Sequence, residues 1–109
     1  GSRVCNYMFP EFEVHLNQLP PRAAQEWHYH RQIEEIVVVN SGRLTFCWLE
    51  GEEYREAPVE AGSLVRVKGS VHNFENRTDD TVSFTVFRMV PDGEDKSSII
   101  KHDRTVVEG

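Results

Sequence analysis

The stretch WHYHRQIEEIVVVNSG, from Trp27 to Gly42, joins two kinds of residues that seldom share one segment. Two histidines stand one residue apart, at His28 and His30, and two adjacent glutamates follow them. Four β-branched residues, Ile36 to Val39, come next and end at Asn-Ser-Gly, a sequence typical of a tight turn. The stretch therefore predicts a buried strand with chemically active side chains close to its start.

Outward from this stretch, the chain alternates between short apolar runs and turn residues. Phe12, Val14 and Leu16 alternate with Glu13 and His15 at period two, which indicates a strand with Glu13 and His15 on a solvated polar face. Short strands separated by turns at regular intervals are typical of an antiparallel sandwich or barrel, so an all-β fold is expected. The other strands expected are 36–39, 44–49, 64–67, 72–75 and 81–90.

The length of 109 residues fits one domain over residues 1–109. Gly1 and Ser2 resemble an expression scar. The segment from Glu94 to Gly109 reads as a polar C-terminal tail, in which Ile99-Ile100 and Val106-Val107 are candidate edge strands.

Composition limits the partners and the compartment. The formal net charge is −6 and no run of Lys and Arg offsets it, which argues against nucleic acid and anionic membrane surfaces as partners. The two cysteines, Cys5 and Cys47, form no CxxC pair, so a reducing, cytoplasmic location is expected. No apolar stretch is long enough to span a bilayer, and no signal peptide is visible.

Neighbouring residues strengthen the prediction that His28 and His30 bind a metal. Residues i and i+2 of a strand point to the same side, so His28 and His30 can approach one ion, but such a pair alone is a weak signal. A carboxylate beside an aliphatic strand is costly unless it is paired or bound to a metal, and Glu34 and Glu35 lie on opposite faces of that strand. A third histidine, His72, follows a glycine turn further along the chain.

These residues resemble the cupin family, whose first motif is commonly G-x5-H-x-H-x(3,4)-E-x6-G and whose second is commonly G-x5-P-x-G-x2-H-x3-N. The chain departs from both motifs: the leading glycine falls at Arg22, Lys68 replaces the proline, Ser63 stands where Asp is frequent, and the glycines of the second motif are one residue closer together. The matching positions are His28, His30, Glu35 and Gly42 for the first motif, and Gly62, Gly69, His72 and Asn76 for the second.

The resemblance implies a jelly-roll β-barrel, also called a double-stranded β-helix, with a metal inside its mouth. Carried over by position, the metal ligands are His28, His30, Glu35 and His72. Glu34 fits the shorter spacing of the first motif, but Glu35 alone keeps six residues before Gly42. Three imidazoles and one carboxylate suit a divalent transition metal, namely Fe, Mn, Ni, Co, Cu or Zn.

Fold alone does not decide the chemistry, so three functions stay open. The first is a metal-dependent, dioxygenase-like enzyme that acts on a small oxygenated or anionic molecule, with Tyr54 and Glu34 as candidate proton donors. The second is a non-catalytic cupin that binds or senses a small ligand, and the third is a sugar isomerase or epimerase. The catalytic residues are unknown at this stage.

Two further features concern surfaces. The strand Ile36 to Val39 is apolar on both faces, so its outer face needs a cover, and a homodimer formed by sheet packing is expected. Arg66, between two valines, is expected to form a surface or interface salt bridge rather than to bind substrate.

Overall fold

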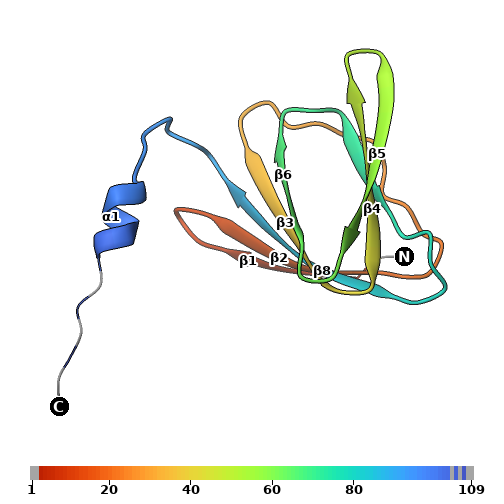
Figure 1. Ribbon diagram of the computed structural model, residues 1–109, viewed down its shortest axis with the longest axis horizontal. Helices are drawn as coiled ribbons and strands as arrows, with labels where there is room; N and C mark the ends of the chain where they lie inside the picture. The colour runs from red at the N-terminus through yellow and green to blue at the C-terminus, as the bar shows by residue number, and fades with distance from the viewer. Residues whose placement is uncertain (1–2, 104, 106, 108–109) are drawn as a thin grey trace.

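The computed structural model describes residues 3–103, 105 and 107, which form two antiparallel sheets and one short helix (Figure 1). One sheet has the order β1-β2-β8-β3-β6 and the other has the order β5-β4-β7. The predicted all-β, jelly-roll fold is confirmed. The strands are β1 (Arg3–Met8), β2 (Glu13–Leu19), β3 (Glu34–Ser41), β4 (Arg43–Glu50), β5 (Glu53–Glu60), β6 (Leu64–Lys68), β7 (His72–Glu75) and β8 (Val82–Met89).

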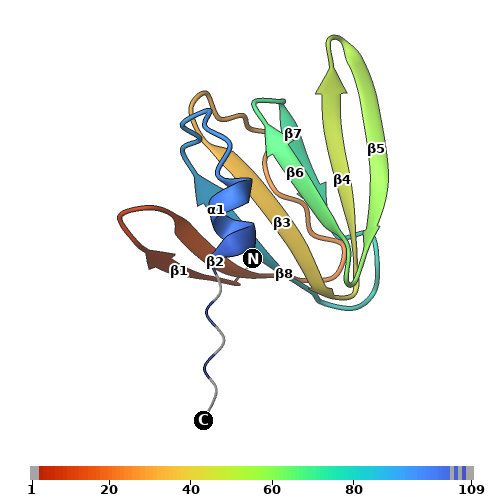
Figure 2. The same ribbon diagram turned by 60° about the vertical axis from the view of Figure 1, so that its left-hand side comes forward.

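The core lies between the two sheets, which Figure 2 shows facing each other across the barrel. Alternate residues of β3 and β8 point inward, so that Val37 and Val39 pack near Phe84. From the smaller sheet, Leu44, Phe46 and Phe74 complete the same cluster.

The turn between β3 and β4 depends on Gly42. Its φ is +85°, a conformation that side chains with a Cβ adopt only under strain. A Cβ at this position would also lie 3.0 Å from Cγ2 of Val82 and 3.3 Å from its Cα. Gly42 therefore allows the β3–β4 connection to pass close over the start of β8.

Strand β2 has the opposite orientation to the one expected. His15, Asn17 and Leu19 point inward and are buried, whereas Leu16 is 46% exposed. The prediction that His15 is solvated is therefore wrong. The reason is the pairing of β2 with β8, in which His15 lies opposite the buried Val86 and Leu16 lies opposite Thr85 on the outer face.

The C-terminal tail also differs from expectation. Ile99 and Ile100 lie in the helix α1 (Ser97–His102), not in an edge strand, and both are exposed. Figure 1 shows α1 set apart from the barrel at the end of an extended segment. Val107 is in no strand, and Val106 lies outside the described residues. In the described part of the chain, no helix has the length and apolar character needed to cross a membrane.

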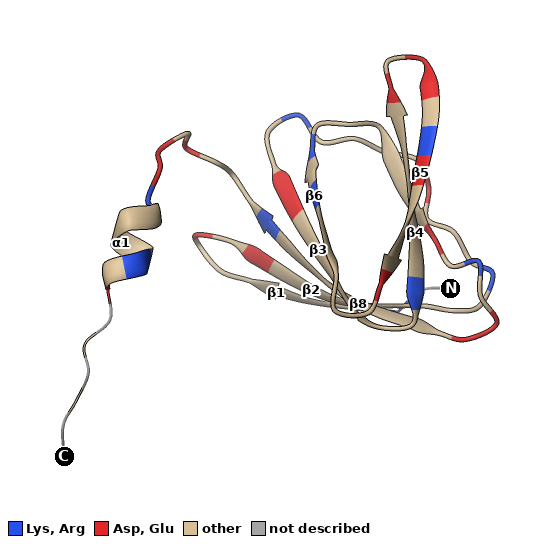
Figure 3. Ribbon diagram, viewed as in Figure 1, with Lys and Arg blue, Asp and Glu red and all other residues tan. Residues whose placement is uncertain are grey.

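Charged residues are spread over many elements, as Figure 3 shows. Most arginines of the barrel contact a carboxylate: Arg22 pairs with Asp79, Arg43 with Glu60, Arg55 with Glu50 and Glu53, Arg66 with Glu34, Arg77 with Glu56 and Glu75, and Arg88 with Glu35. The positive charges are therefore largely balanced locally, and most of these pairs are solvent-exposed ones that contribute little to stability.

Candidate metal centre

The four expected ligands come from three segments that meet at the open end of the barrel. His28 and His30 precede β3, Glu35 lies at the start of β3, and His72 begins β7. The backbones of His28 and His72 are paired: each amide N–H donates to the other carbonyl, at 3.0 and 2.9 Å. This bridge brings the two imidazole rings to a centroid distance of 4.4 Å.

The side chains converge on the Glu35 carboxylate. One ligand atom from each of His28, His30 and Glu35 lies within 4.8 Å of the others. Oε1 of Glu35 is 2.7 Å from Nε2 of His30 and 3.9 Å from Nε2 of His72. The structure therefore brings all four expected residues into one cluster, in which His28, His30 and Glu35 form the tightest group.

Three of the converging atoms are buried without a hydrogen-bond partner among the described residues. They are Nε2 of His30, Oε1 of Glu35 and Nε2 of His72. Nε2 of His30 and Oε1 of Glu35 are 2.7 Å apart, but the geometry between them is not that of a hydrogen bond. Leaving such groups unpaired costs about 1–3 kcal/mol each, and a cation among them would satisfy all three.

The hydrogen bonds on the far side of two rings fix their orientation. Nδ1 of His28 donates to the Glu26 carbonyl at 2.8 Å, and Nδ1 of His72 donates to the Ser70 carbonyl at 2.7 Å. With the proton on Nδ1, the lone pair of Nε2 points into the cluster. Metal-binding histidines commonly carry such a backbone partner. The donor set, its burial and these tautomers all fit a divalent transition metal.

Burial shifts the pKa of one of the four expected ligands, His72. His72 is 1% exposed, and the loss of hydration lowers its pKa from the ordinary value, although the bond to Ser70 acts in the opposite direction. A lowered pKa keeps the imidazole neutral at pH 7. The neutral form is the one that ligates metals.

Glu34 and Glu35 face opposite ways, as strand alternation requires. Glu35 points into the barrel, where its Oε2 accepts a hydrogen bond of 3.1 Å from Nε of Arg88. Glu34 points outward and pairs with Arg66, and this hydrogen bond holds the pKa of the Glu34 carboxyl below its usual range. The expectation that Arg66 forms a salt bridge is therefore confirmed.

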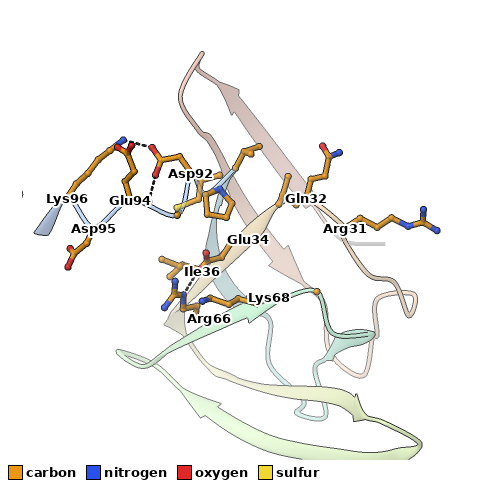
Figure 4. A pocket seen from close by; sticks show the side chains of 16 residues that line it. Arg31, Gln32, Glu34, Ile36, Arg66, Lys68, Asp92, Glu94, Asp95 and Lys96 are labelled. Atoms are coloured by element: carbon orange, nitrogen blue, oxygen red, sulfur yellow. Dashed lines mark hydrogen bonds and ion pairs between the residues drawn. The ribbon is translucent and has the colours of Figure 1, made fainter.

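Figure 4 shows the Glu34–Arg66 pair in a hollow of about 950 Å³. This hollow lies between the outer side of β3 and the segment from Pro91 to Lys96. Its lining includes none of the four converging residues, so its size does not make it the chemical centre. Glu34 lies in this outer hollow and pairs with Arg66, so it is not placed to donate a proton at the cluster of His28, His30, Glu35 and His72.

A second cavity, of about 490 Å³, opens directly onto the cluster. Its lining includes His28 and Glu35 together with residues that the sequence analysis did not assign to a site. They are His15 and Asn17 of β2 and Phe74, Phe84, Val86 and Arg88, with Ala24, Gln25 and Glu26 at the rim. No local signal identifies them, because their common location depends on the pairing of β2 and β3 with β8.

Tyr54 lies away from this cavity, on the outer side of the smaller sheet. Its hydroxyl donates to Glu56 at 2.7 Å and lies 3.3 Å from Sγ of Cys47. Hydrogen bonds with Cys47 and Glu56 raise the pKa of Tyr54 above its usual range. Tyr54 is therefore not placed as a proton donor for the cluster, and Cys47 is a buried thiol in the same outer group.

Arg22 occupies the position where the first motif has its leading glycine. Its φ is +62°, which makes it a left-handed residue with a full side chain. The guanidinium is held by Asp79 at 2.8 Å and by the Arg77 carbonyl at 2.7 Å. Arg22 therefore adopts a conformation that glycine reaches at less cost, and its contacts offset part of the strain.

The chain is therefore a jelly-roll barrel with a cluster of three histidines and one carboxylate, in which Glu35 and His72 are buried and His28 and His30 are half-buried. The family model described as "Cupin domain" matches residues 15–88, and the chain belongs to this family. A comparison with curated proteins finds no match.

Solved structures of other cupins are similar to this chain. A Cupin 2 conserved barrel domain protein from Salinispora arenicola has a TM-score of 0.70 at 23% identity, with 92% of this chain and 81% of that chain covered. A sugar phosphate isomerase of the cupin superfamily from Silicibacter pomeroyi has a TM-score of 0.71 at 27% identity, with 84% and 60% covered. The Cupin_2 domain of an XRE family transcriptional regulator from Enterobacter cloacae has a TM-score of 0.66 at 27% identity, with 83% and 97% covered.

Proposed function

We propose that this protein is a metal-dependent enzyme of dioxygenase-like type that acts on a small oxygenated or anionic molecule. The observation that carries the proposal is the convergence of three buried ligand atoms without hydrogen-bond partners among the described residues. Glu35, which carries one of them, and His28 also line a cavity large enough for a small substrate. A cluster with a structural role alone would not need a cavity beside it.

His28, His30, Glu35 and His72 would hold the ion, and its identity among Fe, Mn, Ni, Co, Cu and Zn stays open. A bound divalent metal supplies Lewis acidity or an oxygen-activating centre. The ligating imidazoles are neutral and Glu35 contributes one negative charge, so a divalent ion would keep a net charge of about +1. The centre would therefore attract anionic molecules. Phe74 and Phe84, which belong to the core, give this cavity an apolar wall against which a carbon chain can pack.

Two other functions have support from the comparisons. The similarity to a cupin domain of a transcriptional regulator supports a non-catalytic, ligand-sensing protein, and the similarity to a sugar phosphate isomerase supports sugar isomerisation. The dioxygenase-like function predicts uptake of oxygen in the presence of an oxidisable substrate. A sensor would bind a ligand without consuming it, and an isomerase would convert its substrate without oxygen.

The metal centre is tested with a matched pair of neighbouring carboxylates. We expect Glu35→Gln to reduce metal affinity at least ten-fold, because the ligand oxygen on the inner face loses its charge. Glu34→Gln should retain the metal, because its side chain lies on the outer face with Arg66. Metal content after purification without chelator, followed by titration of Fe, Mn, Ni and Zn, measures both variants.

Equal metal content in the two variants would show that the proposed ligand set is wrong. Once metal is bound, an oxygen-electrode screen of catechols, thiols and diketones tests the reaction class. An iron-loaded protein that takes up no oxygen with any of them, but binds small ligands, would favour the sensing function.

A homodimer that forms through the outer face of the larger sheet is part of the same proposal. Two cross-strand rows on this face are mostly apolar. Two exposed leucines, Leu16 and Leu64, lie in one row, and Tyr7 lies in the other. A second copy would cover both rows by the isologous packing usual in homodimers. The rows are Tyr7–Val14–Phe87–Ile36–Arg66 and Cys5–Leu16–Thr85–Val38–Leu64.

The two cysteines are both free thiols, Cys5 exposed and Cys47 buried. Free thiols support the expected reducing, cytoplasmic location.

A further inference from the structure

The cavity beside the candidate metal centre has a second polar wall that the metal does not explain. His15 and Asn17 of β2 are only 8% and 7% exposed, although neither is an expected ligand. Arg88 of β8 lies next to them along the same inner face. Buried polar residues around a cavity are the groups that orient a bound molecule.

Among the described residues that line this cavity, Arg88 is the one Lys or Arg. Its Nε donates to Oε2 of Glu35, and this is its one side-chain hydrogen bond among the described residues. A guanidinium has five N–H donors, so the Nη groups of Arg88 keep their capacity for another acceptor. The side chain is 29% exposed, which leaves it accessible from the cavity.

The pairing with Glu35 also fixes the guanidinium in place. Arg88 and Glu35 lie directly opposite each other in the β3–β8 ladder, and the side chain of Glu35 is only 5% exposed. The acidic residue Glu13, which could compete for the guanidinium, is instead in contact with His15. Glu26 also lines the cavity, but it is exposed, so solvent screens its charge. A preorganised cation with free donors therefore faces the cavity.

We infer that this cavity binds a small carboxylic acid, with its carboxylate on the Nη groups of Arg88 and its carbon chain against Phe74 and Phe84. The inference rests on the proposed function, because it gives the substrate class of the same site. The planar fork of one guanidinium pairs with a carboxylate through two parallel hydrogen bonds. It can also pair with a phosphate, but the second negative charge of a phosphate dianion finds no further Lys or Arg among the described residues that line this cavity. The volume of about 490 Å³ limits the acid to a small molecule.

The test compares an acid with its uncharged amide. 2-Hydroxybutyrate, 2-hydroxybutyramide and inorganic phosphate are titrated into metal-free protein and into zinc-loaded protein, and binding is followed by NMR chemical shifts. We expect the acid to bind at least ten-fold more tightly than the amide or phosphate in both forms. The preference depends on the side chain of Arg88 and not on a metal, so we expect it in the metal-free protein as well. The inference can therefore be tested even if the proposed metal centre proves wrong.

Variants assign the preference to Arg88. Arg88→Gln should abolish the discrimination between acid and amide, and Arg88→Lys should retain a weakened preference because it keeps charge but loses the planar fork. Arg66→Gln, on the outer face of the same sheet, is the matched control and should bind the acid as the wild type does. Circular dichroism verifies that each variant is folded, and Arg88→Lys replaces Arg88→Gln if the latter is not. Equal binding of acid and amide by the wild type, tighter binding of phosphate, or unchanged selectivity in both Arg88 variants would overturn the inference.

Discussion

At the scale of single residues, neighbouring side chains of the same type have unrelated roles. Glu34 and Glu35 are equally buried, at 5% and 4% exposed, but one faces Arg66 outside the barrel and the other faces the imidazole cluster inside it. The difference follows from the period of two along a strand. Once it is known which residues of β3 point into the barrel, the alternation along the strand identifies Glu35 as the inner carboxylate.

Arg22 provides a prediction about backbone strain at one residue. The φ of Arg22 is +62°, and both Arg22→Ala and Arg22→Gly remove the contacts to Asp79. Alanine keeps the strain of the left-handed conformation, whereas glycine relieves it. We expect Arg22→Gly to be about 1 kcal/mol more stable than Arg22→Ala. Urea unfolding of the two variants measures the difference. Equal stabilities would mean that the left-handed conformation at this position has no energetic cost.

At the scale of elements, one buried side chain joins the ends of strands that are distant in sequence. Asn76 is 1% exposed, and its Nδ2 donates to the carbonyls of Leu19, Pro20 and Asp80. Its Oδ1 accepts from the backbone N–H and the hydroxyl of Thr78. Asn76 therefore ties the end of β2 to the turn that leads into β8.

We expect Asn76→Ala to destabilise the protein by about 3 kcal/mol, because several buried backbone groups lose their partner. Asn40→Ala is the control: Asn40 is exposed and accepts a single hydrogen bond from Thr85. That change should cost about 0.5 kcal/mol. Thermal unfolding of both variants provides the measurement, and a loss of similar size in the two would contradict the role given to Asn76.

At the scale of the whole molecule, the two faces of the larger sheet serve different purposes. The inner face carries the core and the polar cavity, and the outer face carries two apolar cross-strand rows. Exposed apolar area of this kind on a sheet is typical of an interaction surface. The proposed homodimer would leave the open end of each barrel, with its candidate metal centre, accessible.

The homodimer gives a prediction at this scale. Leu16→Lys should convert the dimer to a monomer, because Leu16 is 46% exposed on the outer face and a buried ammonium without a partner is costly. Leu49→Lys, an exposed leucine on the other sheet, should leave the mass unchanged. Light scattering coupled to size-exclusion chromatography measures the mass of each. A monomeric wild type, or a dimeric Leu16→Lys variant, would contradict the prediction.

The sequence predicted the all-β class from the alternation of apolar residues, and its motifs implied the candidate ligands through their resemblance to those of cupins, because both patterns are local and can be read along the chain. It did not reveal the inward orientation of His15, the helix at Ser97–His102, or the pairing of Arg88 with Glu35. Arg88 and Glu35 are 53 residues apart, and only the register of β3 against β8 brings them together. Cross-strand register depends on how the whole sheet packs. The tertiary structure therefore decided which residues surround the candidate centre, and with them the charge that the cavity presents to a ligand.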